Sequence, residues 1–307
     1  MVLRIEPKET YYKNGVLQHR EYFFNNEHHR DDGPAIESFY RDGSIKTREW
    51  LLAGRHHRED GPAMEAFNPD GTIVISRWHI NGCYHREDGP AYETFYSPTF
   101  PDQREWYRHD KLHREDGPAR ESFYPAGGLS YREWHIDGLI HREDGPAYES
   151  FHANNVLHSY LWTKRGKRHR DGGPAYESFY ATGILRCREQ RIHGKTHCED
   201  GPAIEWFSED GIIQTREWYI DGRLHRLDGP AREIFSDNGT LVVYEWYNNG
   251  IRHRLDGPAK EYFSSCGTRT NVAYYLGGMH LSKDMYQRRI ALQKLTTEHS
   301  AACEVFL

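Results

Sequence analysis

Short aromatic-rich runs with alternating polar and apolar positions, each ended by a turn signal, fill most of the chain. In residues 117–144 one run, Arg-Glu-Ser-Phe-Tyr, ends at Pro-Ala-Gly-Gly, and a second, Leu-Ser-Tyr-Arg-Glu-Trp-His-Ile, ends at Asp137-Gly138. Runs of this length joined by Gly-containing turns are typical of β-hairpins. No helical periodicity competes within the unit. The pattern therefore predicts two antiparallel strands joined by a tight turn.

The unit recurs every 28 residues, marked by nine copies of Gly-Pro-Ala that follow a His-Arg-x-Asp run or a close variant. The marking glycines are Gly33, Gly61, Gly89, Gly117, Gly145, Gly173, Gly201, Gly229 and Gly257. A fixed period of this size is the signature of a linear repeat array, whose small units bury a core only by stacking. The amino-terminal segment follows the same 28-residue register, because it has the equivalent residues Glu9, Tyr11 and Asn14-Gly15. About ten units are therefore expected over residues 1–280.

Residues 281–307 change character. Ser282 is a suitable N-cap, and Met285, Ile290, Leu292 and Leu295 lie on or near one side of a helix. Because an open array leaves a sheet edge exposed, we interpret this tail as a capping helix, with a partner-binding peptide as the alternative. The expected fold is an all-β repeat protein, an elongated meander of about ten 28-residue β-hairpin units with a short C-terminal capping helix.

Alternation along the first strand separates a uniform face from a variable one. Ala119, Glu121 and Phe123 point to one side, and the same Ala-Glu-Phe set occurs in all nine copies. The alternate positions vary freely, so we expect the uniform face to pack between units. Tyrosine and arginine are frequent at interface hot spots. The variable set predicts a partner-binding face lined by Tyr92, Arg120, Tyr148 and Tyr176.

The second strand carries a tryptophan in most copies. The positions are Trp50, Trp78, Trp106, Trp134, Trp162, Trp218 and Trp246, with Gln190 and Tyr274 as replacements. Tryptophan in register every 28 residues predicts a stacked ladder with a large apolar area.

The uniform glutamate needs a cation, because carboxylates are seldom covered without a partner. The available cations are the arginine of the His-Arg pair and the strand arginine of the Arg48 series. We predict an Arg–Glu network that holds adjacent units in register. Since Cys198 replaces the arginine in one unit, Glu177 or Glu205 is expected to be the least well paired glutamate.

The His-Arg-x-Asp-Gly-Pro-Ala run is the strongest candidate for chemistry. Repeated His and Asp could form a metal-binding ladder. We favour a turn in which Asp accepts backbone N–H bonds, Gly takes a positive φ, Pro sets the entry to the next strand and His bonds a carbonyl. No P-loop, zinc cysteine pairs or nucleophile elbow occur in the sequence. The sequence predicts a protein that is not an enzyme and has no catalytic, cofactor or metal site.

Composition supports a thin, surface-rich body. Mean hydropathy is −0.90, yet aromatic residues make up 14% of the chain, which is unlike a disordered chain. The net charge of −6 argues against nonspecific nucleic-acid binding. The amino terminus lacks the apolar core of a signal peptide, no apolar run is long enough to span a bilayer, and the five cysteines fall at unrelated repeat positions. We expect an intracellular, cytoplasmic protein with reduced thiols.

Two segments carry a family resemblance: Tyr11-Tyr-Lys-Asn-Gly-Val-Leu17 and Glu217-Trp-Tyr-Ile-Asp-Gly-Arg-Leu224. They resemble hairpin repeats of the MORN-repeat superfamily, in particular those of bacterial YwqK-type antitoxin-like proteins and of repeat proteins from large DNA viruses. The resemblance covers about residues 1–280 and implies a twisted sheet of antiparallel hairpins used for protein contact, scaffolding or membrane association. A standard MORN unit is shorter and ends in Gly-x-Gly, so no binding residue is transferred.

These observations favour a non-enzymatic scaffold that binds protein partners through an extended face. A structural virion or assembly component that self-associates, and a membrane-associated adaptor of the MORN kind, are the alternatives. The acidic balance disfavours lipid binding and nucleic acid as a partner.

Overall fold

The computed structural model describes the backbone of residues 6–304 and the side chains of residues 6–295. The chain divides into two compact units, with the boundary between Gly166 and Lys167. Each unit is described by itself.

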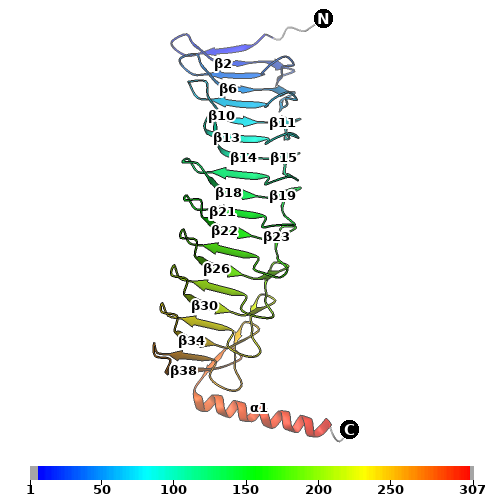
Figure 1. Cartoon of the computed structure of the whole chain (residues 1–307). Helices are drawn as coiled ribbons and strands as arrows, with labels where there is room; N and C mark the ends of the chain where they lie inside the picture. The colour runs from blue at the N-terminus through cyan, green and yellow to red at the C-terminus, as the bar shows by residue number, and fades with distance from the viewer. Residues whose placement is uncertain (1–5, 305–307) are drawn as a thin grey trace. The chain divides into compact units, whose positions relative to one another are not determined.

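In the first unit, consecutive strands pair antiparallel with their neighbours in sequence and form one sheet layer (Figure 1). The sheet strands are β1 (Lys8–Tyr11), β2 (Leu17–Glu21), β5 (Ile36–Phe39), β6 (Ile45–Glu49), β9 (Met64–Phe67), β10 (Ile73–Arg77), β13 (Tyr92–Ser97), β14 (Phe100–Glu105), β17 (Arg120–Phe123), β18 (Leu129–Glu133), β21 (Tyr148–Phe151) and β22 (Leu157–Leu161). The short strands are β3 (Phe23–Phe24), β4 (Glu27–His28), β7 (Leu51–Leu52), β8 (Arg55–His56), β11 (His79–Ile80), β12 (Cys83–Tyr84), β15 (Tyr107–Arg108), β16 (Lys111–Leu112), β19 (His135–Ile136), β20 (Leu139–Ile140) and β23 (Thr163–Lys164).

The second unit continues the same hairpin order. Its sheet strands are β25 (Tyr176–Phe179), β26 (Leu185–Glu189), β29 (Ile204–Phe207), β30 (Ile213–Glu217), β33 (Arg232–Phe235), β34 (Leu241–Glu245), β37 (Lys260–Phe263), β38 (Arg269–Leu276) and β39 (Met279–Leu281). The short strands are β24 (Lys167–Arg168), β27 (Arg191–Ile192), β28 (Lys195–Thr196), β31 (Tyr219–Ile220), β32 (Arg223–Leu224), β35 (Tyr247–Asn248) and β36 (Ile251–Arg252), and the chain ends in helix α1 (Lys283–Glu304).

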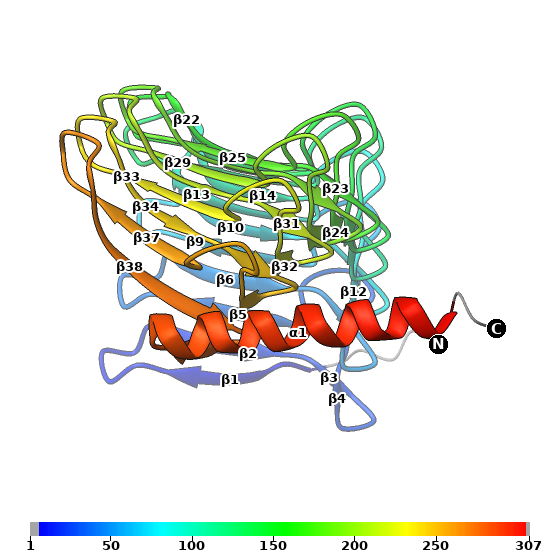
Figure 2. The same cartoon turned by 90° about the horizontal axis from the view of Figure 1, so that it is seen from below.

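The repeats from β1 to β36 each hold four strands instead of the two expected, because the second run bends at the tryptophan position. The last repeat holds three, β37 to β39, since β38 continues through Tyr274. The sheet strand β14 ends at Glu105, and the N–H of Trp106 donates to the carbonyl of Ala119 at 2.8 Å. The carbonyl of Trp106 accepts from the N–H of His113 at 3.0 Å. The residues after the tryptophan therefore leave the sheet and form a separate two-residue hairpin, such as β15–β16. In each unit these short hairpins lie at one end of the sheet strands (Figure 2).

The two turns of a repeat differ in kind. In the sheet turn between β5 and β6 only Gly43 has a positive φ, of +89°, and the register of the two strands shifts between Ser38 and Phe39. This is the type I turn with a G1 bulge that three-residue hairpin loops adopt. The short-hairpin turn has positive φ at both central residues, such as Asn81 at 52° and Gly82 at 89°, which is a type I′ turn.

Alanine forms the most deeply buried column of the array. Ala119 has no exposed surface, and the equivalent alanines of the other eight copies are at most 1% exposed. The N–H of Ala119 donates to the carbonyl of Glu133 at 2.7 Å, and the equivalent bond ties Ala35, Ala91, Ala147, Ala175 and Ala203 to the second sheet strand of their repeats. A larger side chain here would have to displace its neighbours.

Helix α1 covers the last strands of the second unit (Figure 1). Tyr286 is 5% exposed and packs with Leu276 and Leu281, and its hydroxyl accepts from the N–H of Gly257 at 3.0 Å. No helix in the described part of the chain is long and apolar enough to cross a membrane. The predicted all-β hairpin repeat with a C-terminal helix is confirmed.

Candidate functional site

An arginine clamp closes at least seven of the nine loops that carry the His-Arg-x-Asp-Gly-Pro run or its variants. In the fourth copy the guanidinium of Arg114 lies 4.1 Å from the ring centroid of Trp106. Its Nε donates to Asp116 Oδ1 at 2.8 Å, and its Nη1 donates to the carbonyl of Pro118 at 3.3 Å. One side chain thus joins the aromatic ring, the acidic residue and the proline of a single loop. The ion pair also lowers the pKa of the Asp116 carboxyl below its usual value.

The clamp recurs along both units. A guanidinium lies over the equivalent ring, at 3.9–4.2 Å, in the pairs Arg30–Tyr22, Arg58–Trp50, Arg86–Trp78, Arg142–Trp134, Arg226–Trp218 and Arg254–Trp246. The predicted tryptophan ladder is therefore wrong for the six tryptophans whose ring contacts are described: their partner is an arginine of the same repeat. The cation–π contact explains the arrangement, because a guanidinium stacked on indole also keeps its edge donors free for hydrogen bonds.

The loop glycine is required by the clamp. A Cβ on Gly117 would lie 2.8 Å from Arg114 Cζ, closer than real Cβ atoms approach other atoms. The same clash, at 2.5–2.9 Å, occurs at Gly33, Gly61, Gly89, Gly145 and Gly229, while at Gly173 and Gly257 the approach is a tight contact of 3.2–3.3 Å. None of the marking glycines has a positive φ, so the conformational reason expected from the sequence is wrong.

The histidine of the loop accepts a hydrogen bond from the next repeat. The N–H of Asn81 donates to Nδ1 of His57 at 3.1 Å, and the same bond spans 24 residues in seven further copies. The expected bond to a carbonyl is wrong in its direction. An accepting Nδ1 requires the neutral ring with its proton on Nε2. In the described residues, no group of three His, Cys, Asp or Glu side chains is arranged to hold a metal ion.

The predicted Arg–Glu network is present between strands. Glu205 accepts from Nε of Arg188 in the preceding strand and pairs with Arg216 in the following one at 3.4 Å. Equivalent pairs join Arg20 to Glu9 and Glu37 and Arg216 to Glu233. Two loop arginines also reach this glutamate row, in the pairs Arg226–Glu233 and Arg254–Glu261. Their main partner is the loop aspartate.

The expectation that Cys198 leaves a glutamate poorly paired is wrong for Glu205, which has two strand arginines. Glu177 also has an interaction partner. Burial raises the pKa of Glu65 instead, although Arg48 and Arg58 lie nearby and oppose the shift. Strand arginines alone are therefore enough to pair the glutamate of the repeat that lacks a clamp.

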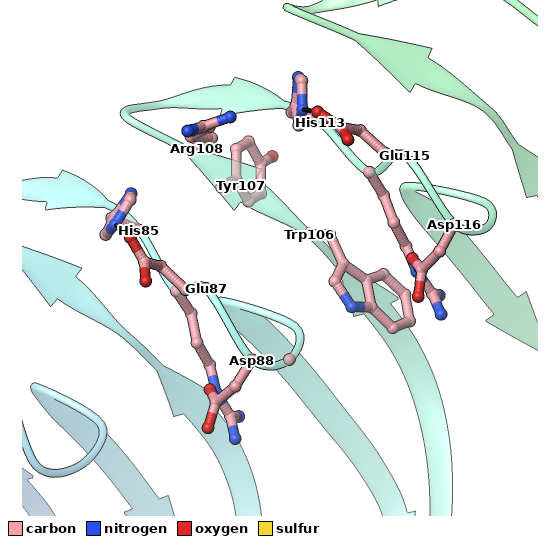
Figure 3. Close-up of a pocket in the computed structure, with 12 residues that line it drawn as sticks. His85, Glu87, Asp88, Trp106, Tyr107, Arg108, His113, Glu115 and Asp116 are labelled. Carbon is pink, nitrogen blue, oxygen red and sulfur yellow. Dashed lines mark hydrogen bonds and ion pairs between the residues drawn. The ribbon is translucent and has the colours of Figure 1, made fainter.

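Open crevices separate consecutive loops (Figure 3). The crevice between the loops of His85–Asp88 and His113–Asp116 has a volume of about 630 Å³, and Trp106 and Tyr107 form its floor. A second crevice of about 520 Å³, three repeats further on, is lined by the equivalent residues 170–173, 190–192 and 197–201. The loop acids stand at the mouth of the crevice: the side chains of Glu87 and Asp88 are 89% and 81% exposed.

The four residues predicted to bind a partner all contact other side chains of the protein. All are half-buried. Arg120 pairs with Glu105 at 2.7 Å and Glu133 at 3.4 Å, while the Tyr148 ring stacks near Tyr131 at 6.2 Å. The Tyr92 and Tyr176 rings lie under Arg77 and Arg168, with the guanidinium at 5.6 and 5.9 Å from the ring centroid. Their partner-binding role stays a prediction.

The clamp and the crevices were missed at the sequence level, although a signal was present. Arginine follows the aromatic residue by eight positions in every copy with a clamp. The one copy with Cys198 in place of arginine also has Gln190 in place of tryptophan. The joint loss of both residues is what a direct contact between them predicts.

No protein-family profile and no curated protein matches the chain. Among solved structures, alternansucrase in complex with isomaltononaose is 14% identical with a TM-score of 0.18; the match covers 82% of this chain and 18% of the enzyme. Choline binding protein F from Streptococcus pneumoniae is 13% identical with a TM-score of 0.20, over 90% of this chain and 99% of that protein. The TcdB2-TccC3-TEV structure is 12% identical with a TM-score of 0.18, and the match covers 88% of this chain and 15% of that chain. Such low TM-scores carry no argument about function.

Proposed function

We propose that the protein is a non-enzymatic scaffold that binds a protein partner along its loop row, defined as the successive His-Arg-x-Asp-Gly-Pro loops. The observation that carries the proposal is the recurrence of the crevice at the same register in both units. A repeat adds two antiparallel strands, so crevices of adjacent repeats are about 10 Å apart. An extended polypeptide can enter several such crevices at once, and repeat proteins commonly bind in this way.

Pairing of the loop charges supports a binding role over a catalytic one. Arg114 is held by Asp116 and Trp106, and the loop histidine accepts a backbone hydrogen bond. A catalytic acid, base or nucleophile is distinguished from its equivalents by its surroundings, whereas these groups have the same partners copy after copy. The MORN-like resemblance and an intracellular place of action belong to the same proposal.

The test removes charge from the loop row and leaves the clamp intact. The triple variant Glu59→Gln, Glu87→Gln, Glu115→Gln alters exposed carboxylates that carry no clamp bond. A matched control places amides at the exposed acids Glu209, Asp210 and Asp237, which lie in the sheet turns between β29 and β30 and between β33 and β34. Immobilised wild-type protein is incubated with extract of the native source, and captured proteins are identified by mass spectrometry.

A specific partner captured by the wild type and the control, and lost with the loop triple variant, supports the proposal. Retention by the triple variant refutes the loop row as the binding surface. A separate variant with alanine at Tyr92, Arg120, Tyr148 and Tyr176 tests the half-buried face, with circular dichroism to verify the fold. Selective loss in that variant would place the partner there instead. Concentration-dependent self-association in light scattering, or uptake by anionic vesicles, would favour the assembly or membrane alternatives.

A further inference from the structure

The seventh copy of the loop keeps its shape without the clamp. Cys198 stands at the position of the clamp arginine and Gln190 at that of the tryptophan. The N–H of Gln190 still donates to the carbonyl of Ala203 at 2.7 Å, and that of Cys198 to the carbonyl of Tyr219 at 3.1 Å. These match the bonds of Trp106 and Arg114 in the fourth copy. The loop backbone therefore forms without the guanidinium.

The acceptors that bind this guanidinium elsewhere are all retained. Asp200 and Pro202 occupy the positions of the clamp aspartate and the clamp proline. Asp200 is exposed, and no lysine or arginine of the described side chains forms an ion pair with it. A Cβ built on Gly201 meets no atom within 4 Å, whereas at the other eight marking glycines it meets a guanidinium at 2.5–3.3 Å. The thiol of Cys198 does not occupy this space.

The position is open to solvent through the second crevice, of about 520 Å³, which Gln190, Cys198, Asp200 and Gly201 line. Its lining has three carboxylates, Asp171, Glu199 and Asp200, against the two arginines Arg170 and Arg191. Arg191 is already bonded to Glu189 at 2.8 Å and to the carbonyl of Gly194 at 3.2 Å. The crevice thus favours an added cation.

We propose that this seventh loop, formed by residues 198–202, binds an arginine side chain of a partner polypeptide in trans. The proposal rests on the proposed function, since it names the chemistry of one contact with that partner. The arginine would donate to the Asp200 carboxylate and the Pro202 carbonyl and lie over Gly201, as the intramolecular arginine does in the other copies. Lysine does not replace it, because a single ammonium cannot present the planar fork of donors that these two acceptors match. The size of the crevice leaves room for main chain beside the guanidinium.

The test titrates the purified full chain with the pentapeptide Gly-Gly-Arg-Gly-Gly, followed by NMR of the Gly201 amide and the Gln190 side-chain amide. Gly-Gly-Lys-Gly-Gly and methylguanidinium are the comparison probes. Cys198→Arg supplies an internal occupant, and Gly201→Ala places a methyl group in the guanidinium position. Cys198→Ala is the matched control, because it changes the same residue and leaves the position open.

Saturable shifts with the arginine peptide are expected in the wild type and in Cys198→Ala. Affinity should fall by about tenfold or more in Cys198→Arg, in Gly201→Ala and with the lysine peptide. Absence of saturable shifts in the wild type, or equal binding by Cys198→Arg, overturns the proposal. If methylguanidinium binds as tightly as the peptide, the site takes a free guanidinium compound and the polypeptide form is overturned. These outcomes are independent of the capture experiment, which tests the loop row as a whole.

Discussion

Two equivalent glycines offer a direct test of what the arginine clamp contributes to stability. Alanine at Gly117 would place its Cβ 2.8 Å from Arg114 Cζ, so the guanidinium must move away. Alanine at Gly201 meets nothing within 4 Å. Neither glycine has a positive φ, so the backbone tolerates alanine at both positions. The same substitution therefore breaks the clamp in one repeat and leaves the other unchanged.

The expected difference follows from the three contacts of Arg114. The cation–π contact with Trp106 at 4.1 Å contributes about 1 kcal/mol at a half-buried site. The ion pair with Asp116 adds little, because the carboxylate is 84% exposed and screened by water. The bond to the Pro118 carbonyl at 3.3 Å adds about 1 kcal/mol. Loss of the clamp should therefore cost about 2 kcal/mol.

Glycine-to-alanine replacement also restricts the unfolded chain, which stabilises by about 0.4–1 kcal/mol where no strain is introduced. Gly201→Ala should therefore be neutral or slightly stabilising, and Gly117→Ala should destabilise by about 1–1.5 kcal/mol. This entropic contribution is the same for both variants. The difference between their free energies of unfolding therefore measures the stability that the clamp contributes.

Native-state hydrogen exchange is the suitable assay, because repeat arrays do not unfold as a single two-state unit. The probes are the N–H groups of Trp106 and Ala119 in the fourth copy and of Gln190 and Ala203 in the seventh. A loss of about 1.4 kcal/mol corresponds to exchange about tenfold faster near Gly117→Ala. Equal effects of the two substitutions, or unchanged exchange at Trp106 in Gly117→Ala, would refute the clamp as a stabilising element.

Three further predictions concern other parts of the fold. Burial lowers the pKa of His79 to about 4, so the imidazole of the unfolded chain is protonated before that of the folded chain as the pH falls below 6.5. The free energy of unfolding should therefore decrease by up to about 3 kcal/mol between pH 6.5 and 4. The variant His79→Phe should flatten that part of the pH profile, measured by urea unfolding. Tyr286→Phe removes the hydroxyl that accepts from the Gly257 N–H and should cost about 1 kcal/mol, seen as faster exchange at Gly257 without loss of helical circular dichroism. Glu245, whose side chain is 3% exposed, pairs with Lys260 at 2.9 Å, so Lys260→Met should destabilise by about 1–3 kcal/mol in urea unfolding at neutral pH, and Lys260→Arg should restore most of the loss.

The sequence predicted the repeat, the hairpin turns and the terminal helix because these depend on neighbours in the chain. Asp-Gly and Asn-Gly dipeptides specify turns locally, and a fixed 28-residue period leaves room only for identical stacked units. The Arg–Glu network was also predictable, since a half-covered glutamate in every copy needs a cation.

The sequence predicted less well the contacts between segments that are distant along the chain. The bend at Trp106 was missed because its backbone bonds go to Ala119 and His113, which no local propensity indicates. Gly117 was assigned to a positive φ, the usual reason for glycine, whereas the approach of a guanidinium is the cause. The loop histidine was expected to bond a carbonyl, but the neighbouring repeat presents an N–H to it.

The amino-acid sequence by itself determined the period, the strand-and-turn alternation and the order of the hairpins, because hydrogen-bonding turns and side-chain alternation act over a few residues. The tertiary structure decided which of several arginines meets which ring or carboxylate, since that choice depends on distances across the strands of stacked repeats. Cys198 is an example of such a decision by the tertiary structure. Only the folded loop reveals that the hydrogen-bond acceptors for a guanidinium are retained in the one repeat whose own chain supplies no arginine at that position.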